Sequence, residues 1–116
     1  MRALCVGSAM VDIITIVASR DVERLTMHNA TASYLLLEQG RKIESESIST
    51  HIGGGAVNAA VAMARMDVDV SALIKIGSDA NGAQIIDRLA HEGVDDSLAL
   101  RTSELPTGTA VMVSSH

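Results

Sequence analysis

Aromatic residues, cysteine and proline are almost missing from this sequence, which has no Trp or Phe, one Tyr, one Cys and one Pro. Because Tyr34 is the only aromatic residue, aliphatic side chains must build the core, and nucleobases find no aromatic platform on which to stack. A single cysteine excludes an internal disulfide and a cysteine cluster for a metal ion. Cys5 lies in the apolar run 3–6, so we expect a buried and inert thiol.

Positive charge is also scarce, since nine Lys and Arg residues stand against fourteen Asp and Glu and give a net charge of −5. Binding to a phosphate backbone normally requires a basic surface, so we expect no nucleic-acid partner. No apolar run approaches the roughly 20 residues that cross a bilayer. Asp12 interrupts the apolar start, and no small-residue cleavage site of a signal peptide is present. We therefore expect a soluble, cytoplasmic protein without a membrane partner.

The first half of the chain predicts strands and an exposed flap. The apolar run 3–6 ends at a Gly-Ser pair, which is typical of a strand buried on both faces of a parallel sheet. Residues 13–17 are β-branched and predict a second strand, whereas the polar stretch 18–33 predicts a loop. Residues 34–52 predict two strands around a glycine. The second of these is too polar to be central, so we expect it to project from the main sheet.

The second half alternates strands and helices. Three consecutive glycines lead into 56–66, whose alanine content predicts a helix. Residues 68–76 predict the next core strand, and 84–91 predict a second helix. This alternation is typical of βαβ units, and a 116-residue chain with 47% hydrophobic residues can form one compact domain around them. Residues 98–102 and 109–114 flank the proline-containing turn 104–108, and this pattern predicts a terminal hairpin.

The two helices carry local start and stop signals. Asp79 is expected to cap the second helix rather than to bind a ligand, and Gly93 is expected to end it. Met63 and Met66 of the first helix are interpreted as core residues. The buried stripe of the second helix is expected to contain Ile85, Ile86 and Leu89.

The glycine run 53–55, with Asn58 three residues later, is the most informative segment. Consecutive glycines before a helix let a ligand approach a backbone where unpaired N–H groups and the positive helix end converge. A tight structural turn is the alternative interpretation of such a run. A dinucleotide fingerprint needs Gly or Ala where Asn58 stands, and a Walker-type loop needs Gly-Lys-Ser/Thr, so neither pattern fits. We therefore expect a different polar ligand.

The same residues resemble the amino-terminal signature of the ribokinase (PfkB) family of carbohydrate kinases. That signature runs Gly-Gly, a short spacer, Asn, a small residue two positions on, and a glycine after the next strand. Here these residues are Gly53, Gly54, Asn58, Ala60 and Gly77. Further segments that resemble the family, in the same order, are Gly7-Ser8 with Asp12 and the runs 77–82, 91–95 and 106–110.

Three positions depart from the family pattern. Asp67 stands where the signature ends the first helix with Gly or Ser. A left-handed conformation at this position, which glycine adopts freely, has a steric cost for aspartate. In ribokinases proper, a lysine and an asparagine occupy the places of Gly55 and Met10. The resemblance therefore implies a sugar kinase, but not one for ribose.

By this resemblance, Asp12 and Asn58 hold sugar hydroxyls, and Gly54 and Gly55 supply close backbone contact. A carboxylate can accept hydrogen bonds from two vicinal hydroxyls, and an amide donates and accepts in fixed directions. Two structural alternatives stay open: Asp12 can be a cap or turn residue, and Asn58 can be a helix-start residue bonded only to backbone. His51, beside the glycines, is expected to be an exposed flap residue.

The resemblance implies an α/β fold, in which a doubly wound, Rossmann-like parallel sheet carries a small β-sheet lid over the sugar. These 116 residues are expected to be its amino-terminal part. The core is expected to comprise about 1–11 and 53–97, and the lid about 12–52 and 98–116. Many family members associate through this lid, so we expect a homodimer.

The resemblance also implies that ATP and Mg²⁺ bind in a carboxyl-terminal half, beside a Gly-Ala-Gly-Asp motif whose aspartate is the catalytic base. No such motif occurs here, so we expect no catalytic, cofactor-binding or metal-binding residue in this chain and no phosphoryl transfer by it alone. The expected function is that of an ATP-dependent kinase for a sugar or sugar-like alcohol. The alternative is a non-catalytic domain that binds a small polyol or assembles through its exposed strands.

Overall fold

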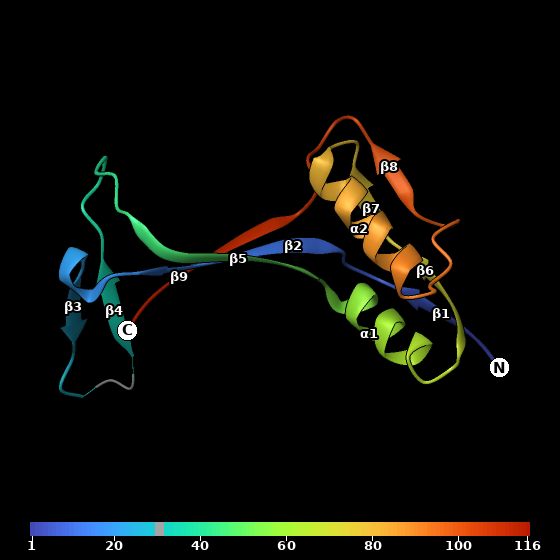
Figure 1. The fold of residues 1–116 in the computed structure, drawn as a ribbon, viewed down its shortest axis with the longest axis horizontal. Helices are drawn as coiled ribbons and strands as arrows, with labels where there is room; N and C mark the ends of the chain where they lie inside the picture. Colours follow the sequence, from blue (N-terminus) through green and yellow to red (C-terminus); the bar gives the residue numbers. More distant parts are fainter. Residues whose placement is uncertain (30–31) are drawn as a thin grey trace. The chain divides into compact units, whose positions relative to one another are not determined.

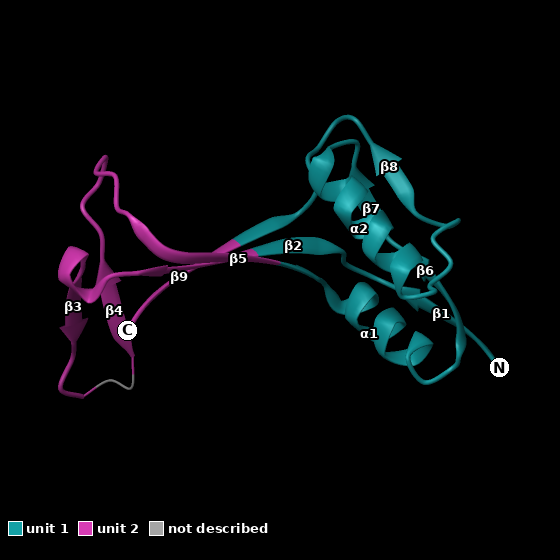
Figure 2. Cartoon of the chain, viewed as in Figure 1, with its two compact units in different colours: residues 1–12, 51–110 teal, residues 13–50, 111–116 magenta. Residues whose placement is uncertain are grey.

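A computed structural model describes residues 1–29 and 32–116, which divide into two compact units. Unit 1 comprises Met1–Asp12 and His51–Ala110, and unit 2 comprises Ile13–Thr50 and Val111–His116 (Figure 2). Along the chain (Figure 1) the elements are β1 (Arg2–Val6), β2 (Met10–Val17), η1 (Ser19–Asp21), β3 (Glu23–Thr26), β4 (Ser33–Leu36), β5 (Ser45–Gly53), α1 (Gly55–Ala64), β6 (Asp69–Leu73), β7 (Lys75–Gly77), α2 (Ala80–His91), β8 (Leu100–Thr102) and β9 (Thr109–Ser115).

Unit 1 contains two pairs of short parallel strands and both α-helices. β1 pairs in parallel with β6, from Arg2 opposite Asp69 to Val6 opposite Leu73, and β7 pairs in parallel with β8. Helix α1 packs against β1 and β6, and α2 packs against β7. Parallel strands covered by helices confirm the predicted α/β class. The single strand predicted over 68–76 is divided into β6 and β7.

One face of these strands is buried and the other is open. The even-numbered residues from Val70 to Ile76 are at most 2% exposed, whereas Leu4 and Val6 of β1 are 55% and 66% exposed. Cys5, which alternates with them, is buried as predicted. The prediction that β1 is buried on both faces is wrong for this chain, because the helices cover only the face that carries Cys5.

The ends of the helices follow the local sequence in part. Asp79 is the N-cap of α2 and accepts a hydrogen bond from the N–H of Gly82 at 2.8 Å, and Gly93 follows the helix with a φ of +76°, so both predictions are confirmed. After α1, Asp67 adopts a φ of +61°, a left-handed conformation that costs a residue with a Cβ about 1–2 kcal/mol. Met66, predicted in the core, lies beyond the last helical turn and is 67% exposed.

Glu92 joins the carboxyl-terminal ends of α1 and α2. Its Oε2 accepts a hydrogen bond from Nε of Arg65 at 2.8 Å, and its Oε1 accepts one from Nη2 of Arg65 at 2.5 Å. Nε of Arg88 also donates to Oε1, at 3.0 Å. The Arg65 guanidinium, followed by that of Arg88, lowers the pKa of the Glu92 carboxyl to about 2.

Glu92→Gln is expected to lower the melting temperature by an amount that depends on pH. The folded chain favours the ionised carboxylate, so its stabilising contribution is complete above the ordinary pKa of 4.5 and is lost as the pH falls toward about 2. Thermal unfolding should therefore show a constant difference between wild type and variant at neutral pH and a shrinking one in acid. Glu104→Gln, which removes a carboxylate without an ion pair among the described residues, is the control. A difference independent of pH would contradict this account of the Glu92 contacts.

Unit 2 contains an antiparallel pair, β3 with β4, and parts of three longer strands. These strands form a sheet in the order β5, β2, β9, and each has residues in both units. Thr15 and Ser45 exchange a side-chain hydrogen bond of 2.6 Å between β2 and β5. The loop predicted over 18–33 is partly wrong, because η1 and β3 lie within it; residues 30 and 31 of that stretch lie outside the described residues.

The terminal hairpin predicted over 98–114 is not formed. β8 pairs with β7 and β9 pairs with β2, so the connector between them links strands of different sheets. By their contacts, residues 98–110 belong to unit 1. The connector therefore crosses unit 1, and it reaches the site described next.

Candidate functional site

Helix α1 starts from a backbone conformation that favours glycine. Gly54, its N-cap, has a φ of +98°, and a Cβ at this position would come within 2.4 Å of the carbonyl oxygen of Ser8. A side chain would be strained by the dihedral angle and obstructed by the segment between β1 and β2. Gly54 is therefore required by the protein's own packing, whether or not a ligand approaches it.

Ser8 accepts hydrogen bonds from two backbone N–H groups at the start of α1, where the sequence analysis expected a ligand. Its hydroxyl accepts a hydrogen bond from the N–H of Gly55 at 2.9 Å, and its carbonyl accepts one from the N–H of Ala56 at 3.2 Å. Two first-turn donors that were expected to be unpaired are therefore used within the protein. Sequence analysis missed this role because Ser8 lies 47 residues before Gly55, outside any local capping pattern.

The side chains of Asp12 and Asn58 both lie close to Gly53. A Cβ placed on Gly53 would be 2.8 Å from Oδ2 of Asp12 and 4.0 Å from Oδ1 of Asn58. Asp12 comes from β2 and Asn58 from the first turn of α1, so the glycine turn brings together two polar side chains that are 46 positions apart in sequence. The structure thus places three of the predicted site elements, the aspartate, the asparagine and the glycine turn, in one location.

The polar groups of Asp12 and Asn58 are available to a ligand. Asp12 is half-buried and Asn58 is exposed. Within residues 1–29 and 32–116, neither side chain makes a hydrogen bond or an ion pair. The capping and turn-forming bonds that the structural alternatives require are therefore not made among these residues. Sugar binding by Asp12 and Asn58 stays a prediction, and the geometry permits it.

The three glycines of the turn have different surroundings. Gly54 packs on the Ser8 backbone, and Gly53 leaves room for the Asp12 carboxylate. Gly55 is exposed, and the nearest atom to a Cβ built on it is Oγ of Ser8 at 3.8 Å, an ordinary contact. Of the three glycines, only Gly55 therefore has open space around it, and close backbone contact with a ligand at this position stays a prediction.

Two other residues considered in the sequence analysis are His51 and Asp79. His51 is exposed, as predicted. Asp79, besides capping α2, accepts hydrogen bonds from the N–H and the hydroxyl of Thr107, at 2.8 Å and 2.6 Å. The Thr107 hydroxyl, and then the Thr107 and Gly82 N–H groups, lower the pKa of the Asp79 carboxyl. Asp79 is therefore an ionised structural group in this structure.

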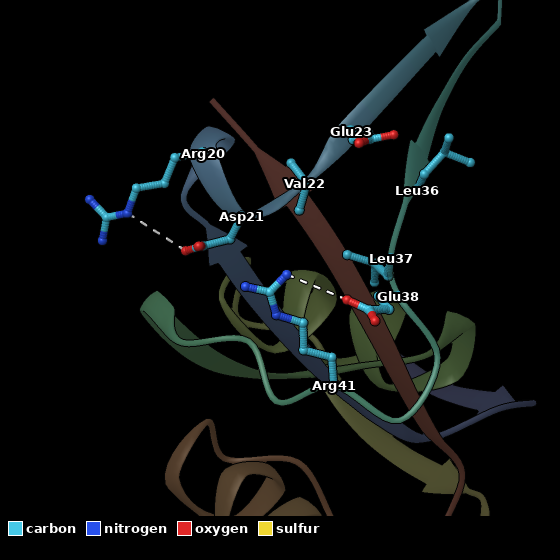
Figure 3. A pocket seen from close by; sticks show the side chains of 8 residues that line it. All are labelled: Arg20, Asp21, Val22, Glu23, Leu36, Leu37, Glu38 and Arg41. Carbon is cyan, nitrogen blue, oxygen red and sulfur yellow. Dashed lines mark hydrogen bonds and ion pairs between the residues drawn. The ribbon is translucent and has the colours of Figure 1, made fainter.

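A groove of about 400 Å³ in unit 2 differs from the site around Gly53 in that ion pairs form part of its lining (Figure 3). Nε of Arg20 lies 3.8 Å from Oδ2 of Asp21, and Nη1 of Arg41 lies 3.5 Å from Oε2 of Glu38. Both guanidinium groups are thus paired with carboxylates, and leucine side chains form much of the remaining lining. Glu23 also lines the groove, and its carboxylate makes no hydrogen bond or ion pair among the described residues.

No three His, Cys, Asp or Glu side chains among the described residues are grouped so that they could hold a metal ion. In the described part of the chain, neither helix has the length and apolar character needed to cross a membrane.

The pfkB family carbohydrate kinase model matches residues 2–116. Among curated proteins, the 2-dehydro-3-deoxygluconokinase of Bacillus subtilis (strain 168) is 31% identical over 88 residues, which cover 75% of this chain and 27% of that protein. A solved structure of fructokinase from Xylella fastidiosa with bound ATP is 26% identical with a TM-score of 0.68, and the match covers 97% of this chain and 29% of that one.

The nucleoside kinase of Methanocaldococcus jannaschii, described as an archaeal member of the ribokinase family, has a TM-score of 0.75 at 21% identity. That match covers 99% of this chain and 33% of the other, and it shows a shared fold. The chain thus spans no more than about a third of the length of these proteins.

Proposed function

Because the chain belongs to the pfkB family of carbohydrate kinases, we propose that it supplies the sugar-binding part of a kinase that transfers the γ-phosphate of ATP to a sugar hydroxyl. The observation that carries this proposal is the convergence of Asp12 and Asn58 beside Gly53, where the polar groups of both side chains bond to none of the described residues. Gly55 adds an exposed stretch of backbone at the start of the same helix.

In this role the residues bind and orient the sugar. The Asp12 carboxylate accepts hydrogen bonds from two vicinal hydroxyls, and the Asn58 amide accepts through Oδ1 and donates through Nδ2. Gly55 lets the sugar ring lie against the backbone without meeting a side chain. Holding the sugar through these hydroxyls sets where the separate, attacking hydroxyl lies, and this matters because phosphoryl transfer depends on positioning and electrostatic stabilisation.

The nucleotide and the base are proposed to lie in the remainder of a longer protein. The open face of β1, with Leu4 and Val6 more than half exposed, supports this proposal. Parallel sheets are almost always covered on both faces, so further elements are expected to pack here. A carboxylate cluster suited to Mg²⁺ is not found among the described residues, and we place ATP, Mg²⁺ and the catalytic base in that further part.

The substrate is proposed to be a sugar or sugar-like alcohol other than ribose. Gly55 and Met10 stand where ribokinases have lysine and asparagine, so two ribose-site positions offer no polar side chain here. The relatives described above are named for 2-dehydro-3-deoxygluconate, fructose and nucleosides, and these compounds define a starting panel.

A coupled assay of ADP formation by the complete protein tests the proposal. Each compound of the panel, ribose included, is supplied with ATP and Mg²⁺, and the control is ATP without sugar. Turnover with at least one sugar, and poor turnover of ribose, is the expected result. Binding of a sugar without any turnover would favour the alternative, a non-catalytic polyol-binding domain.

Unit 2 is proposed to act as the family's lid and to join two copies of the protein. Its exposed apolar side chains include Ile48, Val111 and Met112, at 67%, 64% and 61%. Exposed strands with apolar side chains tend to find a partner. Light scattering of the complete protein should give the mass of a dimer. Ile48→Lys should shift it to a monomer, whereas Met66→Lys, equally exposed in unit 1, should not; a monomeric wild type at high concentration would contradict the proposal.

A further inference from the structure

Thr107 is the one polar side chain that is fully buried among residues 1–29 and 32–116, with 3% exposure. Its hydroxyl donates to Oδ1 of Asp79 at 2.6 Å and accepts from the N–H of Gly77 at 2.9 Å. Its own N–H donates to Oδ2 of Asp79 at 2.8 Å. Both carboxylate oxygens of Asp79 are therefore bonded to Thr107, and Oδ1 also accepts from the N–H of Gly82.

The surrounding backbone is shaped to these contacts. A Cβ on Gly77 would come within 2.6 Å of the Thr107 nitrogen, and a Cβ on Gly82 within 2.3 Å of the Gly77 carbonyl oxygen. The spacing Gly77-x-Asp79-x-x-Gly82 thus fits the connector between β8 and β9 against the start of α2. We call these four residues, Gly77, Asp79, Gly82 and Thr107, the connector anchor.

The connector anchor leads directly to the candidate sugar site. The carbonyl of Gly108, the residue after Thr107, accepts a hydrogen bond from the N–H of Val11 at 2.9 Å. Val11 is 1% exposed and precedes Asp12. A Cβ on Gly108 would also contact Cβ of Met10 at 3.6 Å, so the connector lies against the backbone that carries the aspartate. The Asp12 carboxylate itself makes no bond to the protein within the described residues, so its position depends on that backbone.

We propose that Asp79 and Thr107 are positioning residues for Asp12, which fix its backbone through Gly108 and Val11 without touching the sugar. This inference rests on the proposed function, since it assumes that Asp12 binds the substrate. A carboxylate that must meet two hydroxyls at once is sensitive to small displacements, and a shift of about 1 Å can cost up to about a hundredfold in rate. Asp79 then has a second role beyond capping α2.

Two substitutions in the complete protein separate positioning from capping. Asp79→Asn retains a good N-cap, but one end of the amide is a donor, so it cannot accept from both the Gly82 and the Thr107 N–H groups. Thr107→Val removes the hydroxyl at nearly constant volume, and Thr107→Ser restores it. We expect the sugar KM to rise about tenfold in Asp79→Asn and Thr107→Val, with the KM for ATP unchanged and with recovery in Thr107→Ser.

The controls distinguish this inference from loss of stability and from failure of the proposed function. Glu92→Gln destabilises the far ends of both helices and should lower the melting temperature without changing the sugar KM. In an Asp12→Ala background, Asp79→Asn should have no further effect on sugar affinity. If Asp12→Ala alone leaves sugar affinity intact, the proposed function is wrong. If Asp12→Ala weakens binding but Asp79→Asn and Thr107→Val lower only the melting temperature, the positioning role is overturned.

Discussion

Asp12→Ala in the complete protein is expected to weaken sugar binding by about a hundredfold or more, because two charge-assisted hydrogen bonds at roughly 1.5–3 kcal/mol each are lost. The carboxylate is bonded to no other group among the described residues, so its removal should leave the fold intact. ATP binding should barely change. Isothermal calorimetry with the preferred sugar and, separately, with a nucleotide measures both affinities.

Two further variants make this test specific. Asp69→Ala removes an aspartate of the same unit, at the start of β6, where it pairs with Arg2 on the surface, and sugar affinity should be unaffected. Gly53→Ala retains the Asp12 carboxylate but places a methyl group 2.8 Å from its Oδ2, so it should weaken sugar binding by displacement. An unchanged sugar affinity in Asp12→Ala would show that this aspartate is only a residue of strand β2.

The features that sequence predicted best are set by local chemistry. Asp79 caps α2 because its carboxylate reaches the N–H of Gly82 three residues later, and Gly93 ends that helix because it can adopt a positive φ. Such signals lie within a few residues, so they can be interpreted without knowing the fold.

The failures concern contacts that depend on distant or additional parts of the chain. Burial of β1 on both faces needs a second layer, and the described residues supply only one. β8 pairs with β7 and does not form the expected hairpin, although turn residues follow β8. Ser8 could not be recognised as a partner of the Gly55 N–H, because nothing in the sequence relates two loops that far apart.

Within the site, resemblance identified Asp12 and Asn58, and the structure adds what surrounds them. The pattern of residues could not show that Gly54 is required by Ser8, that Gly53 borders the Asp12 carboxylate, or that Gly55 is the open position. It also gave no reason to connect Thr107 with Asp12. These relations are distances between segments, which composition and spacing do not encode.

The 116-residue chain alone is expected to transfer no phosphate from ATP to a sugar. Transfer requires a nucleotide cradle, a cation clamp with Mg²⁺ and a carboxylate that accepts the hydroxyl proton. The start of α1 can favour negative charge by about a kcal/mol, whereas enzymes lower barriers by roughly 8–23 kcal/mol. Ser8 already uses two of the N–H groups there, which reduces even that contribution. Asp12 is proposed to bind hydroxyls other than the attacking one, so it is not expected to act as the catalytic base.

The proposed role of this chain is tested by a side-by-side assay of ADP formation by the complete protein and by the purified 116-residue chain, both free of host kinases. We expect sugar-dependent ADP from the complete protein, strongly reduced by Asp12→Ala, and none above background from the chain alone with any pentose, hexose or nucleoside. Sugar-dependent turnover by the chain alone that disappears with Asp12→Asn would contradict both the proposal that the ATP site and the base lie outside these residues and the binding role given to Asp12.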